Sequence, residues 1–250
     1  MLNKIVIPVL LFFNDKYKID EELNIKYIKL LNQSVFKNII LLGTTSEGVL
    51  ISLEDKIKII KLYEKYLNKD INIILTPSVW ALNDFKYLVN ISDRINDILF
   101  LPNSYFNRKE YELHNYINKL FNDTNKNIYL YNLPKNTLVD FTPDITRCLL
   151  DKDLNIKGLK LSHSKNENIK LYKEFKNFNI MYGSDKDIFL SLQMGADMVV
   201  AQNLSASLNL NINESNIQQT ANNIRQFVSK QEHKIKALKQ YIGLNDTVLI

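Results

Sequence analysis

The chain has 250 residues, of which 46% are hydrophobic and 24% charged, and its formal net charge is +5. These values are ordinary for a globular protein with a sizeable core. Lys and Arg are dispersed through every helical segment and form no stripe, so the basic balance indicates a solvated surface and no nucleic-acid partner. Because no apolar run approaches the roughly 20 residues of a membrane span, we also expect no membrane partner.

The single cysteine, Cys148, lies in the run ITRCLL and is expected to be a small buried hydrophobic side chain. One cysteine allows no disulfide within the chain, which fits a reducing compartment and predicts a cytoplasmic location. The N-terminal run 1–16 lacks a small-residue cleavage pattern, so we interpret it as a buried first strand and not as a signal peptide.

Short apolar runs in chain order predict eight strands. They cover residues 5–12, 38–42, 71–75, 97–101, 127–133, 156–161, 178–182 and 197–201. Because the runs are continuously apolar, we expect strands that are buried on both faces, as in a parallel sheet.

Amphipathic segments between these runs predict helices. They cover residues 21–31, 53–67, 83–91, 108–121, 142–150, 166–175 and 185–194, with one or two further helices after Glu214. Ser52 is expected to cap the second helix, with Glu54 and Asp55 in its first turn.

The regular alternation of strands and helices predicts the fold. Strand–helix units of this kind form parallel βαβ arrangements. Eight of them favour a closed (β/α)8 TIM barrel over an open doubly wound sheet, which is the alternative fold. We expect the barrel in residues 1–210 and a short C-terminal helical extension in 211–250, packed on the barrel within a single domain.

Polar clusters end four of the predicted strands, at the edge where such barrels assemble their chemistry. Alternation on strand 156–161 places Gly158 and Lys160 on one face. If this face points inward, Gly158 leaves space beside an ammonium held in the barrel mouth; otherwise Lys160 extends to solvent at the strand end. A lysine partly withdrawn from water becomes a nucleophile toward carbonyl carbon, so an inward Lys160 predicts Schiff-base chemistry.

Two further clusters carry hydroxyl groups. Tyr131 shares a face with Tyr129, and its phenol either carries a proton to and from an imine or is simply a packed aromatic with a hydrogen-bonded hydroxyl. Thr44 and Thr45 follow Gly43 at a strand-to-loop turn in the stretch GTTSEG. This turn lacks the lysine of a phosphate loop, so we expect its hydroxyl and N–H groups to hold a carboxylate.

Four motifs in order along nearly the whole chain are GTTSEG at 43–48, YNLP at 131–134, GLKLS at 158–162 and YGSD at 182–185. Together they resemble the pyruvate-dependent class I aldolase family that includes dihydrodipicolinate synthase, N-acetylneuraminate lyase and 2-keto-3-deoxygluconate aldolase. The resemblance implies a (β/α)8 barrel with extra C-terminal helices, no metal or organic cofactor, and a homotetramer or homodimer.

By the same resemblance, Lys160 takes the position of the Schiff-base lysine and Tyr131 that of the proton-relaying tyrosine. Thr44 and Thr45 take that of the pyruvate carboxylate site and relay. Ser162 lies where several aldolases of the family carry a threonine. The loop that contacts substrate hydroxyls in the sugar-acid lyases corresponds to Gly183, Ser184 and Asp185.

Two departures from the family pattern bear on the substrate. Asn136 stands where the synthase has an arginine that grips its second substrate's carboxylate, which disfavours a role in lysine biosynthesis. Ser104 stands where a relay tyrosine is usual, so either the adjacent Tyr105 substitutes for it or the relay is shortened; both residues are expected to contact substrate.

The sequence therefore predicts a lyase that acts on a small keto acid and its aldehyde partner. The expected substrate is a 2-keto-3-deoxy sugar acid, with 2-keto-3-deoxygluconate as the first choice, cleaved to pyruvate and an aldehyde such as glyceraldehyde. The alternatives are an N-acetylneuraminate lyase, a dihydrodipicolinate synthase-like enzyme, and a catalytically silent pyruvate-binding regulatory relative.

Overall fold

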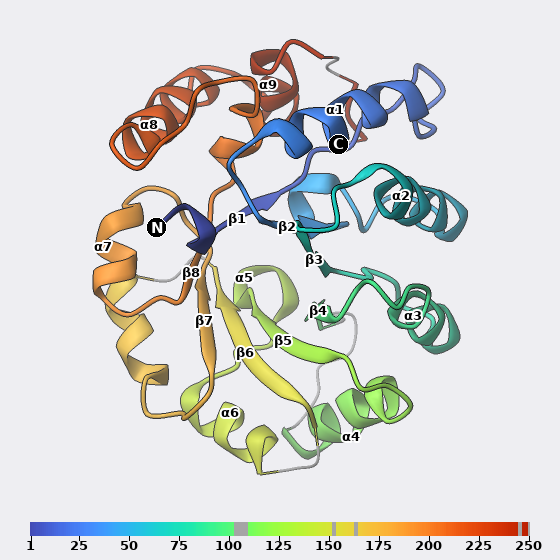
Figure 1. Ribbon diagram of the computed structural model, residues 1–250. Helices are drawn as coiled ribbons and strands as arrows, with labels where there is room; N and C mark the ends of the chain where they lie inside the picture. Colours follow the sequence, from blue (N-terminus) through green and yellow to red (C-terminus); the bar gives the residue numbers. More distant parts are fainter. Residues whose placement is uncertain (103–109, 152–153, 163–164, 245–246, 250) are drawn as a thin grey trace.

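The computed structural model is a closed barrel of parallel strands surrounded by helices (Figure 1). The structure describes residues 1–102, 110–151, 154–162, 165–244 and 247–249. Neighbouring strands pair in chain order, and β1 pairs with both β2 and β8, which closes the ring. The predicted (β/α)8 barrel is therefore confirmed. Its strands are β1 (Ile5–Pro8), β2 (Asn38–Leu41), β3 (Asn72–Leu75), β4 (Asp97–Phe100), β5 (Asn127–Asn132), β6 (Ile156–Leu161), β7 (Asn179–Tyr182) and β8 (Met198–Val200).

The first strand is shorter than the apolar run that predicts it, because β1 ends at Pro8 whereas the run continues to Phe12. The N–H of Val9 still donates to the carbonyl of Ile40 at 3.0 Å. Beyond that point the chain stays buried as part of the main hydrophobic core outside the barrel. Burial, and not strand pairing, keeps this run apolar.

The helices follow the prediction in most segments. They are α1 (Glu21–Gln33), α2 (Leu53–Tyr66), α3 (Leu82–Val89), α4 (Glu110–Phe121), α5 (Pro134–Thr137), α6 (Pro143–Leu150), α7 (Ile188–Gln193), α8 (Ile217–Val228) and α9 (Lys234–Tyr241). The predicted cap of α2 is confirmed, since the Ser52 side chain accepts from the N–H of Asp55. Two predictions are wrong: the segment after β6 is a 3₁₀ helix, Asn166–Tyr172, and Cys148 is exposed on the outer face of α6.

The barrel interior is a separate apolar cluster with members from most strands. It contains Val6, Ile40, Ile74, Leu99, Tyr129, Tyr131, Leu133, Met181 and Val200. Among the described residues, β6 adds no hydrophobic side chain to this cluster. In the β5–β6–β7 register, Tyr131 pairs with Lys160 and Lys160 pairs with Met181. Lys160 therefore occupies a place in the interior where the neighbouring strands carry an aromatic or aliphatic side chain.

Gly158 has a different role from the one expected. A Cβ atom at this position would lie 2.0 Å from the carbonyl oxygen of Asn179 on β7. The missing side chain thus lets β6 and β7 approach closely, and the space is filled by backbone instead of lying open beside Lys160.

We expect Gly158→Ala to lower the free energy of unfolding by about 3 kcal/mol, because a strand backbone cannot move aside as a side chain can. Gly243→Ala is the control: Gly243 has a φ of 73° but no atom within 4 Å of an added Cβ. It should cost only about 1 kcal/mol, from the left-handed backbone. Denaturant midpoints measure both, and equal losses would contradict the argument.

The C-terminal helices complete the ring around the barrel. Figure 1 shows α8 and α9 between α7 and α1, and both pack against the 3₁₀ turn Asn203–Ala206 that follows β8. The expected boundary at residue 210 stays a prediction. In the described part of the chain, no helix has the length and apolar content needed to cross a membrane.

Candidate active site

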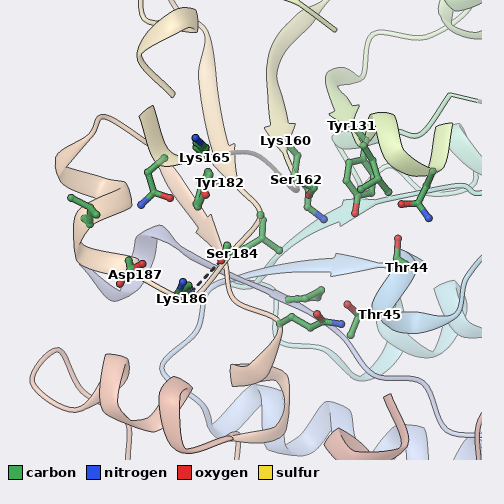
Figure 2. Close-up of a pocket in the computed structure, with 18 of the residues that line it drawn as sticks. Thr44, Thr45, Tyr131, Lys160, Ser162, Lys165, Tyr182, Ser184, Lys186 and Asp187 are labelled. Atoms are coloured by element: carbon green, nitrogen blue, oxygen red, sulfur yellow. Dashed lines mark hydrogen bonds between the residues drawn. The ribbon is translucent and has the colours of Figure 1, made fainter. Parts of the chain in front are cut away.

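A cavity of about 830 Å³ opens at the C-terminal ends of the strands (Figure 2). It is lined by Pro8, Thr44, Thr45, Tyr131, Leu133, Asn136, Lys160, Ser162, Lys165, Asn166, Glu167, Tyr182, Gly183, Ser184, Lys186, Asp187, Leu190, Val200, Gln202 and Lys234. The fold therefore brings together residues from strand ends that are far apart in the sequence.

Lys160 lies on the floor of this cavity. Only 7% of the residue is exposed, and its Nζ lies 4.0 Å from the centroid of the Tyr131 ring on the adjacent strand. An ammonium over an aromatic face is stabilised by the ring quadrupole. Of the two arrangements considered from the sequence, the structure shows the inward one, with the amine held in the barrel mouth.

The hydroxyl of Tyr131 has an unusual environment for a buried phenol. Burial acts to raise the pKa of Tyr131, but the charge of Lys160 and hydrogen bonds with Lys160, Thr44 and Ser162 outweigh it and lower the pKa below its usual value. Figure 2 shows the oxygen of Thr44 directed toward the Tyr131 hydroxyl. A phenol with a lowered pKa is a better proton acceptor near neutral pH than an ordinary tyrosine.

We expect Tyr131 to ionise at lower pH than an ordinary tyrosine. Subtracting the phenolate absorbance titration of Tyr131→Phe from that of the wild type isolates this group. In Lys160→Met the positive charge is lost while burial remains, so the Tyr131 pKa should rise above its usual value. An unchanged pKa in Lys160→Met would contradict this account.

Thr44 and Thr45 are held by a tight turn. A 3₁₀ turn, Thr44–Ser46, follows Gly43, and the N–H of Gly48 donates to the carbonyl of Gly43 at 3.1 Å. A Cβ on Gly48 would lie 2.0 Å from the carbonyl oxygen of Leu42, so only glycine closes the turn. The Ser46 hydroxyl is bonded to the carbonyl of Val9 at 2.7 Å. Both threonines thus reach the cavity from a fixed backbone.

The other predicted site residues divide into three groups. Ser162, Gly183 and Ser184 line the cavity. Asp185 does not: it is buried, and its carboxylate accepts from the N–H and the side-chain amide of Asn203 at 2.6 and 2.8 Å and from Arg225 at 2.8 Å. The expectation that Asp185 contacts substrate is corrected accordingly, since this carboxylate instead joins the β7 loop to α8. The remaining two, Ser104 and Tyr105, lie outside the described residues.

Several residues of the cavity were not predicted. Lys165, Lys186 and Gln202 follow the ends of β6, β7 and β8 within a few residues. A search for polar residues just after the C-terminal end of each predicted strand would have found them. Lys234 comes from the first turn of α9, and no local signal connects it to the barrel mouth. Burial lowers the pKa of Lys234, while the nearby charge of Asp185 opposes this shift.

The described side chains also bear on metal binding. Within the ranges that the structure describes, no group of three or more His, Cys, Asp or Glu residues gathers as a metal site would. The acidic residues of the cavity lining are Glu167 and Asp187. The other polar groups of the lining are amines, phenols, hydroxyls and amides.

The sequence matches the dihydrodipicolinate synthetase family over residues 1–249. The chain belongs to this family. It is 29% identical over 187 residues to the 4-hydroxy-tetrahydrodipicolinate synthase of Thermosipho africanus, a match that covers 70% of this chain and 63% of that relative. The chain thus spans less than two-thirds of the length of the first curated relatives that it matches.

Solved structures of the family share the barrel. YagE of E. coli K12, a prophage protein solved in complex with pyruvate, superposes with a TM-score of 0.85 at 18% identity, covering 100% of this chain and 92% of that one. The 2-keto 3-deoxygluconate aldolase of Picrophilus torridus has a TM-score of 0.80 at 17% identity, with 98% and 95% covered. At such low identity these likenesses show the fold alone.

Proposed function

We propose that this member of the family is a pyruvate-dependent class I aldolase that cleaves a 2-keto-3-deoxy sugar acid, with 2-keto-3-deoxygluconate as the first choice. The observation that carries this proposal is the placement of Lys160: a buried amine inside the barrel, 4.0 Å from the Tyr131 ring and in one cavity with Thr44 and Thr45. A surface lysine would need no such surroundings.

In the proposed reaction, the neutral amine of Lys160 attacks the C2 ketone, and loss of water gives an imine. Tyr131 takes the proton of the C4 hydroxyl as the C3–C4 bond breaks. The electron pair of that bond moves into the protonated imine and leaves an enamine, while C4 departs as the aldehyde carbonyl. Protonation of C3 and addition of water then release pyruvate and restore the Lys160 amine. Thr44 and Thr45 hold the carboxylate and so orient C2 toward Nζ.

The outer part of the cavity favours a substrate whose aldehyde portion carries hydroxyl groups and no charge. Asn136 lines the cavity at the position where the synthase pattern has arginine, so an amide replaces the guanidinium that would pair with a second carboxylate. The rest of the lining mixes the lysines Lys165, Lys186 and Lys234 with the carboxylates Glu167 and Asp187. Donors and acceptors of both signs match sugar hydroxyls better than a single phosphate does.

Trapping with pyruvate tests the proposal. The protein is incubated with pyruvate, reduced with borohydride, and analysed by intact mass and peptide mapping. We expect one adduct per chain, on Lys160. A lack of adduct would overturn the proposal.

An activity panel then separates the candidate substrates: cleavage of 2-keto-3-deoxygluconate, of its 6-phosphate and of N-acetylneuraminate, and condensation of aspartate semialdehyde with pyruvate. We expect the highest kcat/KM with the unphosphorylated sugar acid. Trapping without turnover of any panel member would indicate a pyruvate-binding protein without aldolase activity. A homotetramer or homodimer and the cytoplasmic location stay predictions.

A further inference from the structure

A buried ion pair connects the threonine turn to the last helix. Glu47, which ends the turn, accepts a hydrogen bond through Oε2 from the Nζ of Lys239 on α9 at 2.9 Å. Both side chains are 0% exposed. Neither residue lines the cavity. The pair has no part in the proposed chemistry, yet a buried charge pair needs good geometry to offset the loss of hydration.

The same two side chains also hold the C-terminal segment. Lys239 donates a second hydrogen bond to the carbonyl of Thr247 at 2.6 Å, and the N–H of Leu249 donates to Oε1 of Glu47 at 2.5 Å. On its other side the ammonium lies 4.8 Å from the centroid of the Phe13 ring. Segments 192 and more residues apart in the chain are thereby joined in one largely buried cluster.

The backbone of Glu47 has an unusual conformation that ties it to the threonine turn. Glu47 has a φ of 55°, in the left-handed region, which costs a residue with a side chain about 1 kcal/mol or more and needs support from its surroundings. Its N–H donates to the carbonyl of Thr44 at 3.1 Å. A shift of Glu47 would therefore move Thr44 directly, and Thr45 lies between the two.

We propose that Glu47 is a positioning residue, and that α9 and the C-terminal segment hold the carboxylate-binding threonines in place through it. The inference rests on the proposed pyruvate site. Binding linkage is reciprocal, so pyruvate held by Thr44 and Thr45 also stabilises the contacts of residues 247–249. The C-terminal segment thus belongs functionally to the carboxylate site although it is more than 200 residues away in the chain.

A single substitution and a double substitution separate positioning from stability alone. Lys239→Met leaves the Glu47 carboxylate buried without its cation, so we expect the melting temperature to fall by roughly 10 °C. The pyruvate concentration for half-maximal borohydride trapping should rise about 10-fold, as expected for loss of a charge-assisted hydrogen bond. Glu47→Gln with Lys239→Met removes both charges, and should recover most of the melting temperature but not the pyruvate affinity. Recovery of both would overturn the proposal.

Leu249 offers a matched pair of variants. Leu249→Pro lacks the N–H that donates to Glu47, whereas Leu249→Ala keeps it and loses only side-chain packing. We expect Leu249→Pro to raise the half-maximal pyruvate concentration about 5-fold relative to Leu249→Ala. Equal values in the two variants would overturn the proposal.

Hydrogen exchange without any ligand gives a readout that does not depend on the proposed function. The backbone amides of residues 44–48 should exchange faster in the double variant than in the wild type, because the turn loses the ion pair between Glu47 and Lys239. Equal exchange would overturn the inference, even if the wild-type chain formed no adduct. Faster exchange in the double variant, together with no adduct in the wild type, would support the positioning role of Glu47 and overturn only the proposed function.

Discussion

Lys160→Met is expected to abolish covalent capture of pyruvate and to lower aldol cleavage at least about 10⁴-fold, since the proposed imine forms on the amine that this substitution removes. The protein should remain folded. Lys160 is nearly buried among apolar side chains of the barrel interior, and methionine fills a similar volume without a charge. The free energy of unfolding should therefore stay the same or rise. Borohydride trapping, steady-state cleavage and denaturant unfolding measure the three effects.

Lys157→Met is the matched control on the same strand. Alternation places Lys157 on the opposite face of β6, and it is exposed. Its substitution should leave both the pyruvate adduct and cleavage unchanged. A full adduct in Lys160→Met, or its loss in Lys157→Met, would show that the imine forms elsewhere and would contradict the assignment.

Tyr131→Phe is expected to lower kcat for cleavage by about 10²- to 10³-fold, the usual contribution of a positioned acid–base group. The pyruvate adduct should still form, though more slowly, because Lys160 and the threonine turn remain. The pH dependence supplies a second signature. The Tyr131 pKa is lowered, so its phenolate fraction at a given pH exceeds that of an ordinary tyrosine, and kcat should rise with pH as this group deprotonates. That rise should be missing in Tyr131→Phe.

Tyr129→Phe is the control for this prediction. Tyr129 lies two residues earlier on the same inward face of β5, but burial raises its pKa to about 12, helped by the charges of Asp97 and Asp197 and opposed by a hydrogen bond with Asn179. Such a phenol stays protonated at neutral pH and does not line the cavity. We expect kcat within about twofold of the wild type. A loss as large as that of Tyr131→Phe would indicate a packing effect instead of proton transfer.

The barrel could be predicted because its signals are local. Each strand of a parallel barrel is buried on both faces and reads as an apolar run, and the predicted strands coincide with the observed ones within a few residues. Alternation on one strand placed Gly158 and Lys160 on one face but left open whether that face points inward, and the structure decided this. The larger errors are the strand predicted at residues 9–12 and the α-helix predicted where the 3₁₀ segment 166–172 lies. In both places apolar residues are buried in the outer core, and burial alone does not distinguish a strand or an α-helix from other backbone conformations.

The sequence by itself determined the (β/α)8 architecture and the placement of Lys160, Tyr131, Thr44 and Thr45 at strand ends, because strand periodicity and chain order decide both. Only the tertiary structure decided which of the polar residues near the strand ends line the cavity and which do not. Asp185 stands beside Ser184 in the chain but turns away to Asn203 and Arg225. Lys234 and the anchor formed by Glu47 with Lys239 depend on where the C-terminal helices pack. Such contacts join residues distant in the chain, and no local pattern of residues specifies them.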